Sequence, residues 1–250
     1  MMFTRKMFFV VGATLLCTTA ALGQASGNFT YGTGGGTTAC VMDSGGNITG
    51  GQTCQMSCTI DPTTGISTCT KQTGTCIGNA IAGIKTSSGS GNVFVVRPSA
   101  VIGLLTDVTV SSNQKGSSTG AVSSSALAGA NFWVTVTPES GQGTPTITPN
   151  YPITYDSRYI QISTNLFQAL STQCLAISGG CFISFNQSTV SAHSFDWVVS
   201  KLSSGNYGVT VNWADTLGGS GISQSLTCVG PVNMTVQQNK IFNFNSVNSF

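Results

Sequence analysis

A strict alternation of apolar and polar residues over residues 191–213 constrains this chain more than any other feature. The bulky residues of both halves stand two positions apart: Phe195, Trp197 and Val199, then Tyr207, Val209, Val211 and Trp213. Successive side chains of a β-strand point to opposite faces, so each half predicts a strand with one face on a hydrophobic core. We therefore expect two strands joined at a tight corner, in an antiparallel sheet that buries one face.

The junction between these strands carries a sequence pattern, Leu202-x-x-Gly205-x-Tyr207-x-Val209-x-Val211. The pattern resembles the corner between strands E and F of immunoglobulin-like and fibronectin type III domains, where a tyrosine returns its hydroxyl to the backbone upstream. The Cys…Trp…Cys spacing of an antibody domain is absent. The resemblance implies a two-sheet sandwich, and it implies no ligand or partner.

The beginning of the chain has the features of a secretory signal peptide. Arg5 and Lys6 precede an apolar run over residues 7–16, and small residues follow at positions 20–23. The run is too short to cross a membrane, and no later stretch reaches about 18 continuous apolar residues. We predict that residues 1–23 are removed near Gln24 and that the mature protein is secreted, without a transmembrane span.

The mature chain is formally neutral. The nine Lys and Arg residues less Arg5 and Lys6 leave seven, equal to the seven Asp and Glu residues. Without a cluster of basic residues, nucleic acid is excluded as a partner. Charged residues make up only 6% of the chain, so hydroxyl and amide groups must cover the surface. Such a surface favours self-association or contact with an extracellular neutral polysaccharide.

The cysteines of the mature chain predict disulfides. They are even in number, which suits an oxidising compartment, and they are Cys40, Cys54, Cys58, Cys69, Cys76, Cys174, Cys181 and Cys228. Five precede residue 80 and three follow residue 170, so full pairing requires at least one bridge between the two groups. Cys174 and Cys181 are the best local pair, because Gly179 and Gly180 let the loop between them fold back. The other pairings stay open.

Residues 24–91 are rich in glycine, threonine and cysteine and have few large apolar side chains. We expect this segment to depend on disulfides and to pack against the main domain. Cys54, Cys58, Cys69 and Cys76 are also conceivable zinc ligands. Their irregular spacing and the lack of a nearby histidine favour disulfides instead, and we expect no metal or cofactor.

Residues 92–250 predict an all-β domain, an antiparallel two-sheet sandwich of the immunoglobulin-like or jelly-roll-like kind. Expected strands cover residues 93–97 (ended by Pro98), 104–110, 131–137, 182–185, 222–229 and 232–237, with a loop over 111–129. One helix is expected near 156–171, because Tyr159, Ile162, Leu166 and Leu170 recur at spacings of three and four, with Asp156 as N-cap. The alternation through 159–162 leaves a strand as the alternative.

Trp133 is the one aromatic residue on the polar face of a predicted strand. Phe132, Val134 and Val136 occupy one face of residues 131–137, and Trp133, Thr135 and Thr137 occupy the other. A flat indole beside two hydroxyls can stack on a sugar ring and bond its edges. The competing interpretation is that Trp133 lies beneath the helix or the cysteine-rich segment.

Catalytic patterns are weak. The single histidine, His193, is followed by Ser194 and Asp196, but a strand would direct His193 and Asp196 to opposite faces, and no G-x-S-x-G motif occurs. We expect His193 to be a polar cap at the start of a strand. The acidic residues are scattered singly, whereas glycoside hydrolysis needs two carboxylates near one another.

We therefore expect a non-catalytic secreted or cell-surface protein with a binding, adhesion or structural role. An extracellular hydrolase and a self-assembling coat or fibre protein are the alternatives. Two carboxylates lining a shared cleft would favour the hydrolase, and growth without added ligand would favour the coat or fibre.

Overall fold

The computed structural model describes residues 28–36, 38–61, 63–73, 76–86, 91–111, 123–163, 165 and 181–240. The regular elements within these ranges are all β-strands: β1 (Phe29–Gly34), β2 (Val41–Met42), β3 (Ile48–Thr49), β4 (Gln52–Ile60), β5 (Ser67–Thr73), β6 (Gly78–Thr86), β7 (Asn92–Ser111), β8 (Ser123–Pro138), β9 (Thr146–Thr148), β10 (Ile153–Ser163), β11 (Phe182–Ser194), β12 (Trp197–Ser200), β13 (Gly205–Ser220) and β14 (Ile222–Lys240). Residues 1–27, which include the expected signal peptide, lie outside these ranges.

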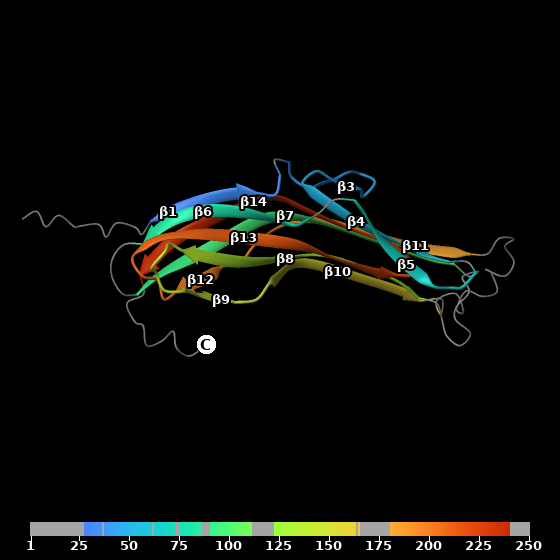
Figure 1. Ribbon diagram of the computed structural model, residues 1–250. Coiled ribbons are helices and arrows are strands. Elements are labelled where there is room, and N and C mark those ends of the chain that lie inside the picture. Colours follow the sequence, from blue (N-terminus) through green and yellow to red (C-terminus); the bar gives the residue numbers. More distant parts are fainter. Residues whose placement is uncertain are drawn as a thin grey trace, which may run out of the picture.

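Two antiparallel sheets make up the body of the protein, and the predicted all-β sandwich is confirmed. The first sheet has the strand order β5-β4-β14-β7-β12-β9, with β1 also paired to β14 and β11 also paired to β7. The second sheet has the order β10-β8-β13-β6. Long strands give the molecule an elongated shape (Figure 1). None of the described residues forms a helix long and apolar enough to cross a membrane.

The core lies between the sheets and contains most of the residues predicted from alternation. Trp197, Val199, Val209, Val211 and Trp213 are fully buried, and Tyr207 is nearly so. The prediction for Phe195 is wrong. β12 begins only at Trp197, and Phe195 stands before it, 40% exposed, with its ring edge-on to the Trp197 indole.

The corner over residues 201–204 connects the two sheets. β12 belongs to the first sheet, where it pairs with β7, and β13 belongs to the second, where it pairs with β8. The Tyr207 hydroxyl donates a hydrogen bond to the carbonyl of Ser203 and accepts one from its amide. This is the arrangement that the resemblance to an E–F corner implies.

The helix predicted near 156–171 is wrong over residues 156–163, which form part of β10. In its register with β8, Arg158 lies opposite Ala128 and Ile160 opposite Ala126. Residues 156–163 form a strand because pairing with β8 satisfies the hydrogen-bonding groups of their backbone and turns alternate side chains inward. Tyr159, which the helix prediction placed on the buried side, is 60% exposed. Asp156 caps no helix. The rest of the predicted helix, apart from residue 165, lies outside the described residues.

Pro98 does not end a strand, because β7 continues through it to Ser111. On one side Pro98 lies opposite Met234 of β14. On the other side it lies between the end of the β12 pairing at Val96 and the start of the β11 pairing at Ser99. A residue without an N–H group is tolerated at such a gap in the ladder. The Pro98 carbonyl accepts a hydrogen bond from the buried Tyr155 hydroxyl.

The loop predicted over 111–129 is wrong for residues 123–129, which begin β8. The Ser and Ala side chains that suggested a loop instead let the two sheets approach closely. Ser124 Oγ donates a hydrogen bond across the sandwich to the Thr109 carbonyl at 2.7 Å. Thr227 Oγ1 donates to the Gly129 carbonyl at 3.1 Å and accepts from the Gly129 amide. Residues 112–122 lie outside the described residues.

The cysteine-rich segment, residues 24–91, contributes strands to both sheets. It supplies β1, β4 and β5 to the first sheet and β6 to the second. The Trp213 indole N–H of the second sheet donates to Gln52 Oε1 of the first at 3.0 Å. A short hairpin of β2 and β3 buries Ile48 against Leu105 and the Cys40–Cys228 bridge, forming a small second core.

Three disulfides connect described residues: Cys40–Cys228, Cys54–Cys76 and Cys58–Cys69. The first joins the N-terminal group of cysteines to the C-terminal group, as the odd count in each group required. The other two disulfides use Cys54, Cys58, Cys69 and Cys76, the four conceivable zinc ligands, and so favour disulfides over zinc at these positions. Cys181 is disulfide-bonded, while Cys174 lies outside the described residues, so their pairing stays a prediction.

Candidate binding face on the second sheet

The outer face of the second sheet carries the three residues singled out in the sequence. Phe132 and Val134 of β8 are buried in the core, and Val136 packs against it, so Trp133, Thr135 and Thr137 point outward. Trp133 is partly buried, and the two threonines are exposed. Beneath them, the Phe132 ring stacks on Tyr155 at 4.1 Å and on Trp213 at 5.8 Å, which holds this part of β8 firmly.

The strand β13 adds polar groups beside this row. Asn212 lies opposite Trp133, Thr210 opposite Thr135, and Gly208 opposite Thr137. Asn212 Nδ2 donates a hydrogen bond to Thr135 Oγ1 at 3.2 Å. The pattern that buries Tyr207, Val209 and Val211 also turns Gly208, Thr210 and Asn212 outward. The alternation in the sequence therefore predicted that these residues point outward. Only the pairing of β13 with β8 shows that they lie beside Trp133.

The next strand, β6, extends this outer face of the sheet. Asn79 and Ile81 lie opposite Asn212 and Thr210, and Ile81 is 62% exposed. A Cβ atom placed on Gly83 would meet no other atom within 4 Å. The N-terminal segment was one of two expected covers for Trp133, but its strand β6 lies two strands away in the plane of the same sheet. The helix was the other, and it is not formed over residues 156–163.

We call Trp133, Thr135, Thr137, Thr210, Asn212 and Asn79 the Trp133 face. These residues carry no formal charge and offer hydroxyl and amide groups around one indole. Strands rise about 3.3 Å per residue, so the row from Trp133 to Thr137 is about 13 Å long. A flat neutral ligand with many hydroxyl groups matches this chemistry.

A second polar cluster joins β11 to β10 at the side of the sandwich. Ser191 Oγ lies 2.7 Å from His193 Nε2 and donates to Asp156 Oδ2 at 3.0 Å, while His193 Nε2 lies 3.3 Å from the same Asp156 oxygen. A hydrolytic triad holds the serine and the carboxylate on different ring nitrogens. Here both groups approach Nε2, so the carboxylate cannot orient the ring for proton transfer from the serine.

The expected role of His193 as a cap at the start of a strand is also wrong, because His193 stands one residue before the end of β11. Its contacts with β10 clamp two strands of different sheets. Neither Ser194 nor Asp196 takes part in this cluster.

Two further carboxylates are engaged in ion pairs. Asp215, whose side chain is only 8% exposed, accepts both its hydrogen bonds from Lys71 Nζ at 2.9 Å. Asp196 is held by the Arg97 guanidinium, with Arg97 Nη2 at 2.6 Å from Oδ2. The hydrogen bonds from Arg97 hold the pKa of the Asp196 carboxyl below its usual range.

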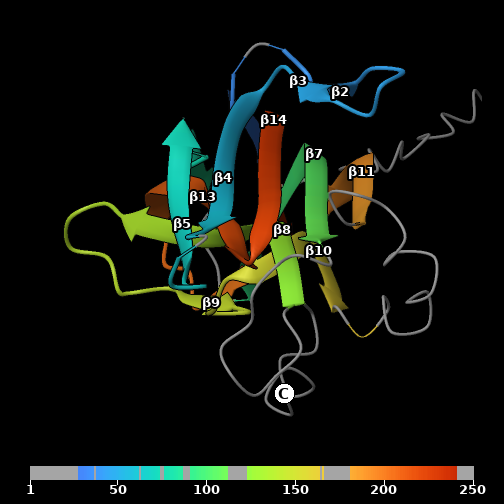
Figure 2. The same ribbon diagram turned by 90° about the vertical axis from the view of Figure 1, so that its right-hand side faces the viewer.

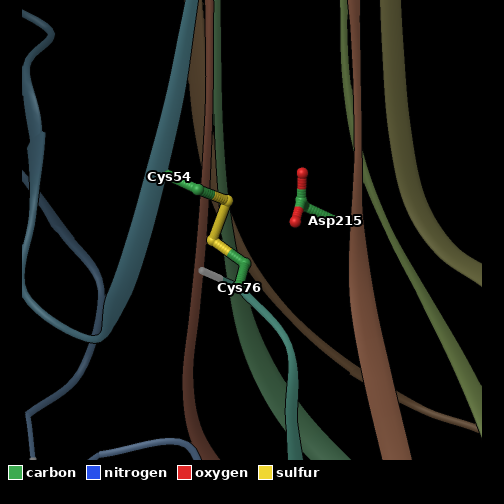
Figure 3. Close-up of side chains that lie close together, drawn as sticks. All are labelled: Cys54, Cys76 and Asp215. Carbon is green, nitrogen blue, oxygen red and sulfur yellow. A yellow bond between two sulfur atoms is a disulfide. The ribbon is translucent and has the colours of Figure 1, made fainter. Parts of the chain in front are cut away.

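Cys54, Cys76 and Asp215 bring their ligand atoms within 4.8 Å of one another (Figure 3). The two sulfurs are joined to each other in a disulfide. Thiolate, not disulfide sulfur, is the metal ligand, and the carboxylate is already paired with Lys71. The group is therefore a structural contact between the sheets.

Comparison of the sequence with protein-family models finds no match, and comparison with curated proteins finds none either.

Proposed function

We propose that this protein is a secreted, non-catalytic binding protein that holds a neutral polysaccharide on the Trp133 face. The observation that carries the proposal is Trp133 itself, an indole set on the outer face of a well-packed strand beside Thr135, Asn212 and Thr210. Stacking on an aromatic ring and hydrogen bonds to neutral polar groups are a suitable combination for sugar rings. The uncharged character of the face disfavours ionic ligands.

Secretion is part of the same proposal. Residues 1–23 have the sequence of a signal peptide. The three disulfides between described residues suit an oxidising compartment. Export is tested by sequencing the N-terminus of the protein recovered outside the cell, which should begin near Gln24; a retained N-terminus on cell-associated protein would contradict it.

Binding is tested with the oxidised mature protein on a panel of insoluble neutral polysaccharides such as cellulose, chitin and β-1,3-glucan. Retention on at least one of them is expected. Trp133→Ala should weaken that retention by about tenfold, equivalent to a stacking contribution of about 1.4 kcal/mol, while the melting temperature stays unchanged. Tyr31→Ala is the matched control, since Tyr31 is 72% exposed but stands on β1 of the first sheet.

Two outcomes would contradict the proposal. No retention of the wild-type protein on any member of the panel would do so. Loss of stability in Trp133→Ala with undiminished retention would identify the indole as packing for the sheet surface instead.

A further inference from the structure

β11 is a long edge strand. It pairs antiparallel with β7 from Phe182↔Ser111 to Ser194↔Ser99 without a shift in register. Among the residues that the structure describes, no strand pairs with its other edge. Figure 2 shows β5, β4, β14, β7 and β11 as successive neighbours, with β5 and β11 outermost in that view. Within the described part of the chain, the backbone N–H and C=O groups along this edge of β11 therefore have no partner strand.

Three of the other edge strands, β5, β9 and β10, carry features that discourage such pairing, and β11 carries none of them. β5 contains Lys71, β9 has only three residues, and β10 contains Asp156, Arg158 and a break in register at Thr154/Asp156. Short length, charge and bulges are the usual protections of sheet edges. β11 has 13 residues with no proline, no glycine, no lysine and no bulge.

The open edge also displays large apolar side chains. Phe182 is 73% exposed and Phe185 is 50% exposed. Phe185 lies opposite Val108, a fully buried residue of β7, so it stands on the core-facing side of the sheet and is nevertheless half in water. Burial of both rings in an interface would stabilise the pairing of β11 with an added strand.

We propose that β11 pairs antiparallel with β11 of a second copy of this chain, joining two first sheets into one continuous sheet across a two-fold axis. Antiparallel pairing of a strand with itself is closed by such an axis. β11 contains no Asp, Glu, Lys or Arg, so the pairing places no like-charged side chains of these kinds opposite each other. The formal neutrality of the mature chain keeps longer-range repulsion small.

A register centred on Ser188 avoids placing the phenylalanine rings of the two copies opposite each other. Phe182 of each copy then lies opposite Ser194 of the other, and Phe185 lies opposite Ser191. Large rings thus face small polar residues and are not forced against each other. The dimer would present two Trp133 faces, and its formation through β11 would not depend on ligand binding to them.

The test is sedimentation velocity of the oxidised mature protein over a series of concentrations. A reversible monomer–dimer equilibrium is expected. Asn186→Lys combined with Ala192→Lys adds charges at two exposed positions of β11 and should raise the dissociation constant at least tenfold. Thr68→Lys combined with Thr70→Lys makes the same charge change on β5, at the opposite edge of the first sheet, and should leave the equilibrium unchanged.

Hydrogen exchange gives a second measurement on the wild-type protein. The amides of β11 that do not bond to β7 should become protected as concentration rises, and those of β5 should not. A protein that stays monomeric, or a dimer that the β11 lysines leave intact in a variant with an unchanged melting temperature, would overturn the proposal. Open-ended growth into polymers would also overturn it, because two-fold pairing is closed.

Discussion

The Tyr207 hydroxyl oxygen lies 2.9 Å from the amide nitrogen of Ser203 and 2.9 Å from its carbonyl oxygen. The phenol therefore closes a ring around the corner where the chain passes from the first sheet to the second. The Tyr207 side chain is 2% exposed, and its ring packs edge-on against Phe94 at 5.5 Å. One residue thus ties the corner to the core between the sheets.

Tyr207→Phe should destabilise the protein by about 1–2 kcal/mol, because the ring stays packed while the Ser203 amide and carbonyl lose their buried partner. Tyr159→Phe is the matched control, since the Tyr159 hydroxyl donates its hydrogen bond to the Gln161 side chain on an exposed surface. The free energy of unfolding from urea titration measures both. Equal losses of unfolding free energy in the two variants would show that the Tyr207–Ser203 hydrogen bonds do not stabilise the corner.

The Cys40–Cys228 disulfide should contribute more stability than Cys58–Cys69. The first spans 188 residues of sequence and the second spans 11. Loop-closure entropy then assigns about 5 kcal/mol to the long bridge and about 3 kcal/mol to the short one. Alanine replacement of both cysteines of each pair, followed by denaturant titration, compares them. A larger loss from the short pair would contradict this order.

Alternation in the sequence predicted the strands whose two faces have different environments. The buried side chains of β13 and of residues 132–136 are examples. The same reasoning placed Trp133, Thr135 and Thr137 together on an outer face. The partners Asn212 and Thr210 needed the strand order, which no local pattern contains.

The predictions failed where long-range pairing overrides local preference. Pro98 lies inside β7 because the adjoining strands β12 and β11 leave a gap beside it. Residues 156–163 are a strand because β8 lies alongside them. The cluster of Ser191, His193 and Asp156 brings together residues that are 35 positions apart and on different sheets. In each case the deciding contact lies far away in the sequence.

The Arg97–Asp196 pair should stabilise the protein at neutral pH and not in strong acid. Hydrogen bonds from Arg97 lower the pKa of Asp196 in the folded state. Its contribution is therefore fully present above the unfolded pKa of about 3.9 and is lost as pH falls through the lower folded value. Asp196→Asn should lower the melting temperature slightly at pH 7, and the difference from wild type should vanish in that acid range.

Arg97→Gln removes the hydrogen-bond donor and should reproduce this pH dependence. The double variant Arg97→Gln/Asp196→Asn should melt at the same temperature as either single variant. Melting curves at several pH values provide the measurement. A difference between wild type and Asp196→Asn that persists unchanged below the acid transition would mean that the effect of Asp196 does not come from its charge.

Gly78→Ala should destabilise the protein by about 2–3 kcal/mol, the cost of overpacking a core. A Cβ atom on Gly78 would lie 2.3 Å from Cζ2 of Trp213, the residue opposite it in β13. The buried indole would have to move and would weaken its hydrogen bond to Gln52. Gly83→Ala in the same strand is the control, because its Cβ would meet nothing within 4 Å. Urea titration and near-ultraviolet circular dichroism should separate the two variants. If Gly78→Ala matched Gly83→Ala in both measurements, the glycines of this segment would not be required for seating Trp213.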